Sequence, residues 1–181
     1  MQDINTQLFF YVQHLAGVSP ALDTFFLFIT NPFIFIILGG FSIWIVFVRP
    51  FLSRDPSERL RALEEALFFV AVMSLIWFVV AIVKAMVVFP RPHQYFYGIR
   101  TLLLYGDFDS FPSLHAAFSF ALATIVFTRK RLLGGTLFVA AALVAFTRVY
   151  VGVHFPIDVI VGGAIGVLIP WGVHLLTKRH I

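Results

Sequence analysis

Long apolar stretches alternate with short polar segments along most of the chain. Four of these stretches lie in its later part, at residues 66–89, 112–128, 132–149 and 157–176. A helix needs about 20 mostly apolar residues to cross a bilayer, and each stretch reaches or approaches that length. A fifth stretch covers residues 33–48 and is bounded by Asn31-Pro32 and Arg49-Pro50. We predict a membrane-spanning helix over each of the five.

The first thirty residues are less regular. Apolar runs lie on both sides of the turn-forming sequence Gly17-Val18-Ser19-Pro20, and Asp23 interrupts the second run. We interpret this region as a broken first span, and the alternative is a helix that lies in the membrane interface. The prediction is therefore an all-α integral membrane helix bundle of about six spans, with residues 1–181 forming a single membrane-embedded domain.

The composition agrees with a membrane protein. Of the 181 residues, 60% are apolar and 12% are charged, whereas soluble domains are about a quarter charged and no more than about half apolar. The chain has no cysteine, which excludes disulfides, thiolate metal sites and a cysteine nucleophile. The net charge of +4 comes from residues in short loops, so it indicates membrane topology, and we expect no nucleic-acid partner.

The basic residues predict the orientation of the bundle. Three basic clusters would share one side of a six-span arrangement: Arg49, Arg54, Arg59 and Arg61; Arg129, Lys130 and Arg131; Lys178 and Arg179. The positive-inside rule assigns that side to the cytoplasm. The remaining four basic residues, Lys84, Arg91, Arg100 and Arg148, fall on the opposite face. Because topology disfavours cations there, these residues are candidates for function.

Three polar clusters at predicted span ends would meet on this opposite face. They are Lys84 to Arg91-Pro92, then Pro112-Ser113-Leu114-His115, then Thr147-Arg148 with His154 and Asp158. The third and fifth spans lead out to this face, and the fourth and sixth lead back from it. We therefore expect the clusters to converge at one membrane surface despite their separation in sequence.

The first cluster supplies two cations. Lys84 and Arg91 are seven residues apart, so they share one helical face if the helix continues to about residue 89. Pro90 and Pro92 predict that the helix ends near that point. The alternative interpretation is two basic side chains that snorkel from the end of a span.

The second and third clusters predict an anion site. Pro112 and Pro156 each suit the first position of a helix, so both helices would direct their N-termini at the same face. Free N–H groups and the positive end of the helix dipole favour a bound anion. Ser113 adds a hydroxyl donor, and Arg148 adds a guanidinium that matches phosphate oxygens. Together with the two cations above, they predict a pocket for a dianionic phosphate.

His115 and His154 are the candidate catalytic pair. A single histidine near a membrane face is more often structural, but here two of them accompany several cations. Cationic neighbours lower the pKa of an imidazole, which keeps it neutral and nucleophilic. Asp158 follows His154 by four residues and can accept its N–H, thereby fixing the tautomer. Alternatively, Asp158 only stabilises the first turn of its helix.

The three clusters resemble the motifs of the type 2 phosphatidic acid phosphatase (PAP2) superfamily of membrane lipid phosphatases. The family pattern is K-x6-R-P, then P-S-G-H, then S-R-x5-H-x3-D, and the order and spacings in this chain agree with it. Two positions differ: Leu114 stands where the family usually has glycine, and Thr147 replaces serine. Neither difference affects a histidine.

The resemblance implies a role for each motif residue. His154 would be the nucleophile that forms a phosphohistidine, Asp158 would orient it, and His115 would protonate the leaving group. The phosphoryl oxygens would be bound by Lys84, Arg91, Ser113 and Arg148. The resemblance implies a hydrolase without a metal or another cofactor, since the cations supply the charge stabilisation.

The segment 93–111 indicates a lipid substrate. Its aromatic residues are Tyr95, Phe96, Tyr97, Tyr105 and Phe108. Aromatic side chains favour the headgroup level of a membrane, so we expect this segment to rest on the bilayer. Undecaprenyl diphosphate and phosphatidylglycerol phosphate are both suitable substrates for a bacterial inner-membrane enzyme whose active site faces the periplasm. The alternatives are a lipid phosphotransferase with the same site, and a transporter or scaffold without chemistry.

Overall fold

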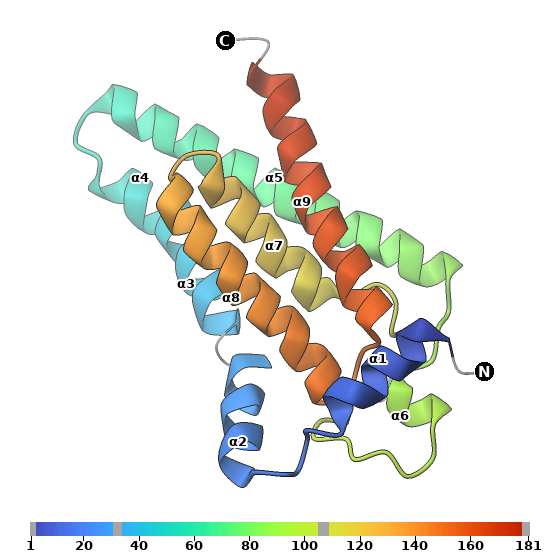
Figure 1. Ribbon diagram of the computed structural model, residues 1–181. Coiled ribbons are helices and arrows are strands. Elements are labelled where there is room, and N and C mark those ends of the chain that lie inside the picture. Colours follow the sequence, from blue (N-terminus) through green and yellow to red (C-terminus); the bar gives the residue numbers. More distant parts are fainter. Residues whose placement is uncertain (1–2, 31–33, 105–108, 179–181) are drawn as a thin grey trace.

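The computed structural model describes residues 3–30, 34–104 and 109–178, and it contains helices but no strand within these ranges. The all-α prediction is therefore confirmed (Figure 1). The helices are α1 (Ile4–Gln13), α2 (Pro20–Phe28), α3 (Ile34–Ile43), a π-helical segment (Trp44–Val48), α4 (Arg49–Leu52), α5 (Pro56–Met86), α6 (Pro92–Tyr95), α7 (Leu114–Phe127), α8 (Arg131–Tyr150) and α9 (Pro156–Lys178).

Among the residues that the structure describes, three helices, α5, α8 and α9, are long and apolar enough to cross a membrane, and shorter apolar helices cover Ile36–Leu52 and Leu114–Phe127. The prediction for residues 66–89 placed the third span too late. Helix α5 begins at Pro56, where the Asp55 side chain accepts a hydrogen bond from the Ser57 N–H at 2.9 Å. This cap starts the helix while the sequence is still polar. Arg59 and Arg61 therefore lie on α5 and not in a loop.

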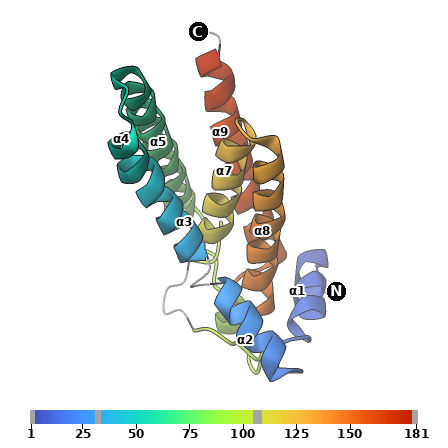
Figure 2. The same cartoon turned by 90° about the vertical axis from the view of Figure 1, so that its left-hand side faces the viewer.

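Helix α7 lies between α8 and α9 and packs against both, whereas α3 and α4 run along α5 (Figures 1 and 2). Glycines allow the close approach of α7 and α9. A Cβ atom on Gly162 would lie 2.3 Å from the Ser113 carbonyl oxygen, and one on Gly166 would lie 2.2 Å from that of Ala117. This spacing of small residues is typical of tightly packed membrane helices.

The two ends of the bundle carry different residues. The α4–α5 and α7–α8 turns and the C-terminal end of α9 lie at one end (Figure 1). The C-terminal ends of α5 and α8 lie at the other, together with α6 and the N-terminal ends of α7 and α9. The three motif clusters are therefore brought to one end, and the turns with their basic residues lie at the opposite end.

The first thirty residues are broken, as expected, into α1 and α2. Helix α1 has 10 residues and α2 has 9, and at 1.5 Å per residue neither can cross a bilayer alone. Helix α1 lies across the motif-bearing ends of α8 and α9 (Figure 1). The Asn5 side chain accepts a hydrogen bond from the Ile157 N–H at 3.0 Å, which ties α1 to the first turn of α9.

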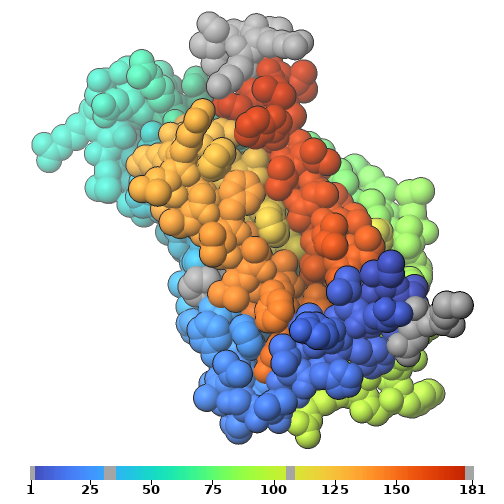
Figure 3. Space-filling model, in the orientation of Figure 1, coloured from blue at the N-terminus to red at the C-terminus, as the bar shows by residue number. Residues whose placement is uncertain are grey.

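Helices α8 and α9 lie on one face in the space-filling view, with part of α7 visible between them and α1 covering the lower part of the face (Figure 3). Large apolar side chains are exposed on the two helices, among them Val139 on α8 and Ile160 and Leu168 on α9. Such a surface suits lipid contact. Together with the long apolar helices it identifies an integral membrane protein.

Candidate active site

His154 lies in a tight turn between α8 and α9. Helix α8 ends at Tyr150, and Gly152 then adopts a φ of 82°, a conformation that favours glycine. The backbone N–H groups of Val153 and His154 both donate to the Arg148 carbonyl oxygen at 3.2 Å. The imidazole is 3% exposed. The turn therefore fixes a buried histidine two residues before the first residue of α9.

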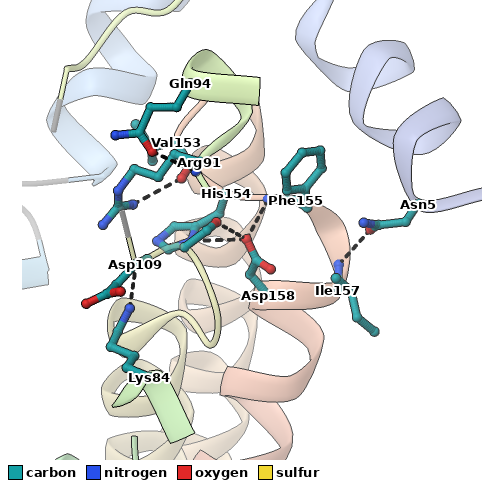
Figure 4. A network of polar contacts seen from close by, with 11 residues as sticks. Asn5, Lys84, Arg91, Gln94, Asp109, Val153, His154, Phe155, Ile157 and Asp158 are labelled. Atoms are coloured by element: carbon teal, nitrogen blue, oxygen red, sulfur yellow. Dashed lines mark hydrogen bonds and ion pairs between the residues drawn. The ribbon is translucent and has the colours of Figure 1, made fainter. Parts of the chain in front are cut away.

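Asp158 and Ser110 hold one edge of the His154 ring (Figure 4). The Nδ1 atom of His154 lies 3.4 Å from Asp158 Oδ2 and 3.4 Å from Ser110 Oγ. Asp158 Oδ2 also accepts hydrogen bonds from Ser110 Oγ and from the Phe155 N–H, the latter at 2.8 Å. Because Nδ1 faces the carboxylate, Nε2 is on the opposite edge of the ring, in the orientation that a nucleophilic imidazole requires.

The predicted cations surround this histidine. Lys84 and Arg91 both lie on the side of the ring away from Asp158, one below and one above in the view of Figure 4. Arg91 Nη1 donates to the Val153 carbonyl oxygen at 3.1 Å, and Lys84 Nζ donates to that of Asp109 at 2.6 Å. Burial lowers the pKa of His154 well below its usual 6.5, and the charges of Arg148, Arg91 and Lys84 lower that pKa further. The imidazole is therefore neutral near neutral pH.

The route by which Arg91 reaches the site differs from the prediction. Helix α5 ends at Met86, so Lys84 and Arg91 do not share a helical face. Arg91 instead stands immediately before α6, with extended backbone, and its own N–H donates to Gln94 Oε1 at 2.9 Å. Pro90 and Pro92 keep this segment out of the helix. Tertiary contacts bring the two cations together.

Helix α7 starts later than predicted, whereas α9 starts at Pro156 as predicted. Leu114, not Pro112, is the first helical residue of α7, and Ser113 is its N-cap. The Ser113 N–H donates to the Asp158 carbonyl oxygen at 2.9 Å, so it ties the beginning of α7 to the first turn of α9. Ser113 Oγ is buried and makes no hydrogen bond to the parts of the chain that the structure describes. The hydroxyl is therefore available to a bound anion.

His115 lies in the first turn of α7. It is close enough to His154 for the two rings to interact electrostatically, and its ring also interacts with the three cations. Within the described ranges, then, the structure brings together the seven residues of the three motifs: Lys84, Arg91, Ser113, His115, Arg148, His154 and Asp158. They come from α5, from the residue before α6, from the start of α7, from α8, from the turn after it and from α9. Arg100, which the charge pattern also made a candidate, donates instead to the Gly17 carbonyl oxygen at 2.9 Å.

Two residues of the site escaped the sequence analysis. Ser110 is buried and bonds to Asp158, and Thr30 is buried and accepts a hydrogen bond from Arg148 Nη1 at 3.1 Å. Thr30 lies 118 positions from Arg148, in a region whose fold the apolar pattern did not predict. Ser110 stands three residues before Ser113. This closeness to the second motif was the only sequence feature that could have indicated Ser110 as a site residue. Serine and threonine in loops are too common for such a signal to be decisive.

The aromatic segment divides into outward and inward residues. Tyr95 and Tyr97 are exposed, in agreement with a position at the membrane surface. Phe96 contradicts that expectation, because it packs against Phe10 and Phe155 with ring centroids 5.0 and 6.2 Å apart. Tyr105 and Phe108 lie outside the described residues. In the parts of the chain that are described, no three histidine or acidic side chains gather as potential metal ligands.

The fold and site define an integral membrane helix bundle with a buried histidine, a carboxylate in contact with it and converging cations at one end. The family model of the PAP2 superfamily matches residues 65–181, and the chain belongs to this superfamily. That segment holds every candidate residue, whereas α1 to α4 lie outside it.

Solved structures share the fold. The crystal structure of LpxE from Aquifex aeolicus superposes with a TM-score of 0.72 at 26% identity, covering 94% of each chain. A transmembrane PAP2-type phosphatidylglycerolphosphate phosphatase from Bacillus subtilis gives a TM-score of 0.65 at 21% identity, covering 98% of this chain and 88% of the other. The helices before residue 65 are thus also part of a shared architecture.

Curated relatives match over shorter segments. The undecaprenyl-diphosphatase BcrC of Bacillus subtilis is 31% identical over 80 residues, 44% of this chain and 41% of its own length. The putative undecaprenyl-diphosphatase YbjG of Escherichia coli is 46% identical over 65 residues, 33% of this chain and 32% of its own. A lipid A 4'-phosphatase of Bacteroides thetaiotaomicron is 43% identical over 76 residues, 41% of this chain and 34% of its own. The chain matches less than half the length of each relative.

Proposed function

We propose that this chain is an integral membrane lipid phosphatase that hydrolyses a phosphomonoester or diphosphate of a lipid through a phosphohistidine. One observation carries the proposal: a buried, neutral His154 presents Nδ1 to Asp158 while Arg148, Arg91 and Lys84 act on it electrostatically. A neutral imidazole beside several cations is suited to attack on a phosphoryl group, whose negative charge the cations stabilise. Residues 1–181 act as one domain in this proposal.

In the first step, His154 Nε2 attacks phosphorus and a P–N bond forms. The bond between phosphorus and the lipid oxygen breaks, and its electron pair leaves with that oxygen. The bound phosphate dianion offsets the charges of the three cations, so His115 is protonated in the complex and donates this proton to the leaving oxygen. Asp158 stabilises the positive charge that develops on His154, while Ser113 and the three cations bind the phosphoryl oxygens.

In the second step, water attacks the phosphohistidine. Neutral His115 accepts a proton from the water, the P–N bond breaks, and its electrons return to His154 Nε2. For a lipid diphosphate, the first step releases the lipid monophosphate and the second releases inorganic phosphate. Transfer to an acceptor other than water would use the same intermediate, and it would make the enzyme a phosphotransferase.

The substrate proposed is a bacterial lipid phosphate of the undecaprenyl diphosphate or phosphatidylglycerol phosphate type. The names of the relatives and of the solved structures support this class. The site lies at the end of the bundle away from the basic α4–α5 and α7–α8 turns (Figure 1). By the positive-inside rule it faces the periplasm from the inner membrane. The lipid tail then stays in the bilayer while its phosphate reaches His154 from this end of the bundle.

Phosphate release by the purified protein tests the proposal. We expect His154→Asn to lose roughly 10⁴-fold or more of the turnover of undecaprenyl diphosphate or phosphatidylglycerol phosphate. The matched control is His174→Asn, because His174 lies on α9 toward the opposite end of the bundle. Near-normal turnover by His154→Asn would refute the nucleophile assignment. A radiolabelled terminal phosphate should give an acid-labile protein label in the wild type and none in His154→Asn.

Two additions to the same assay separate the alternatives. Excess chelator should leave turnover unchanged, and a large loss would reveal a metal requirement. Acceptor lipids should leave the yield of inorganic phosphate unchanged. A phosphorylated acceptor that forms in place of inorganic phosphate would identify a phosphotransferase.

A further inference from the structure

A second cavity lies at the end of the bundle opposite the active site. It has a volume of about 540 Å³ and lies between α3, the π-helical segment, α5, α7 and the start of α8. Its walls are mostly apolar and aromatic, and they include Phe41, Trp44, Ile45, Phe68 and Ile125. A cavity of this size is in the range of small-molecule and lipid sites.

Charged side chains form one side of this cavity. Arg49, Glu65, Arg129 and Lys130 all line it, so three cations and one carboxylate give a net positive charge of two. Arg49 and Arg129 both form ion pairs with Glu65, and the three side chains are 35%, 47% and 21% exposed respectively. The Glu65 carboxylate therefore holds the two guanidinium groups together at the mouth of an apolar cavity.

The π-helical segment Trp44–Val48 forms part of the wall. Such segments are rare and occur frequently at functional sites, because the extra residue in the turn alters which side chains face inward. Here Ile45 is buried in the core, and the neighbouring Trp44 lines the cavity while remaining partly exposed. The π-helical segment therefore supports a functional site here independently of the charged side chains.

We infer that this cavity binds one anionic glycerophospholipid, with an acyl chain against the apolar wall and the phosphate at Arg49, Arg129 and Lys130. A neutral lipid would gain only the apolar contact. Basic pockets between helices on the cytoplasmic side of a membrane favour anionic headgroups, with each nearby cation strengthening binding. The site is independent of the proposed phosphatase activity, since it shares none of the seven active-site residues.

Tryptophan fluorescence can detect this lipid directly. The chain has three tryptophans, Trp44, Trp77 and Trp171. A variant that retains only Trp44 is titrated in detergent micelles with phosphatidylglycerol or phosphatidylcholine whose acyl chains carry bromine, a contact quencher. We expect half-maximal quenching at about fivefold or more lower mole fraction of the phosphatidylglycerol, as the net positive charge requires.

The matched control retains only Trp171. This residue lies on α9 toward the same end of the bundle, but it does not line the cavity. Both brominated lipids should quench it equally, because lipid in the surrounding micelle contacts this residue without headgroup preference. Equal quenching of Trp44 by the two lipids would overturn the inference, because it would show an apolar crevice without headgroup preference.

Charge variants then identify the contributing residues. Lys130→Gln, which does not disturb the Glu65 ion pairs, should remove most of the preference for phosphatidylglycerol, and Glu65→Gln should increase it. Arg131→Gln is the control, because Arg131 starts α8 but does not line the cavity. An unchanged preference in Lys130→Gln, or an equal loss in Arg131→Gln, would contradict the site. Since turnover is not measured, these results stand apart from the test of the phosphatase.

Discussion

The two ends of the bundle use arginine in different ways. At the end with the second cavity, Arg49 and Arg129 pair directly with Glu65, and their side chains are 35% and 47% exposed. At the active-site end, Arg91 and Arg148 are 4% and 1% exposed and donate to the Val153 carbonyl and to the Thr30 hydroxyl. Asp158 meanwhile contacts Ser110, Phe155 and His154.

This contrast teaches that burial decides what a cation does in this protein. A partly exposed ion pair contributes only about 0–1 kcal/mol, because water already solvates both groups. A buried cation acts strongly on its neighbours, since the low local dielectric does not screen its charge. The buried arginines accordingly lower the pKa of His154 beyond the effect of its own burial. Three predictions test the comparison.

The largest difference should be between Arg148→Gln and Arg49→Gln. Arg148→Gln removes a buried charge beside the proposed phosphoryl site, and we expect kcat/KM to fall by roughly 10²–10³-fold. Arg49→Gln removes a half-exposed ion pair, and kcat/KM should stay within about twofold of the wild type. Thermal unfolding in detergent checks that both variants are folded. Equal losses in the two variants would contradict the comparison, because a buried arginine and a partly exposed one would then matter equally for turnover.

The next largest effect is expected at the contact between α7 and α9, which positions Ser113 and Asp158. In Gly162→Ala, the new methyl group would lie 2.3 Å from the Ser113 carbonyl oxygen. Helices α7 and α9 must then separate, at a cost of about 1–3 kcal/mol in the free energy of unfolding. Phosphate release should fall as well, because the Ser113–Asp158 hydrogen bond is disturbed.

Gly172→Ala is the matched control on the same helix. A Cβ atom at Gly172 meets nothing within 4 Å, so this variant should keep its activity and gain slightly in helix propensity. Unfolding in detergent and phosphate release measure both variants. Wild-type stability and phosphate release in Gly162→Ala would show that α7 and α9 have room to adjust.

The smallest effect is a shift in pH dependence. Because the pKa of His154 lies well below 6.5, the neutral nucleophile persists as the pH falls through 6.5, and the acid limb of kcat/KM should lie below that value. Lys84→Met removes a positive charge that lowers this pKa, so the pKa rises and the acid limb moves to higher pH. Profiles of kcat/KM against pH measure the shift, and a shift to lower pH would contradict the proposed electrostatics.

Much of the architecture could be predicted from the chain alone. The apolar runs predicted the helices now called α7, α8 and α9 to within two residues at each end. The start of α5 was missed because its first turns are polar. Polar residues after an apolar stretch are found both in loops and in helices that continue beyond the membrane, so composition alone does not distinguish the two. The break in the first thirty residues was visible in Gly17 and Pro20, but the position of α1 across α8 and α9 was not.

The residues of the candidate site likewise fall into those that the sequence predicted and those that only the structure revealed. Seven residues were recognised because their spacing within short motifs is a local property of the chain. Ser110 and Thr30 were not, since their importance depends on contacts with Asp158 and Arg148 across 48 and 118 positions. The start of α7 at Leu114 likewise follows from the bond between Ser113 and Asp158.

By itself, the sequence determined that the chain crosses a membrane and that three polar motifs lie at one end. Apolar transfer into lipid is nearly additive over neighbouring residues, so it can be read from local composition. Only the tertiary structure decided how Arg91 reaches His154, which hydroxyls support the site, and that a cavity with a charged mouth opens at the far end. Those features depend on how closely helices pack, and packing is set by shape complementarity between distant segments.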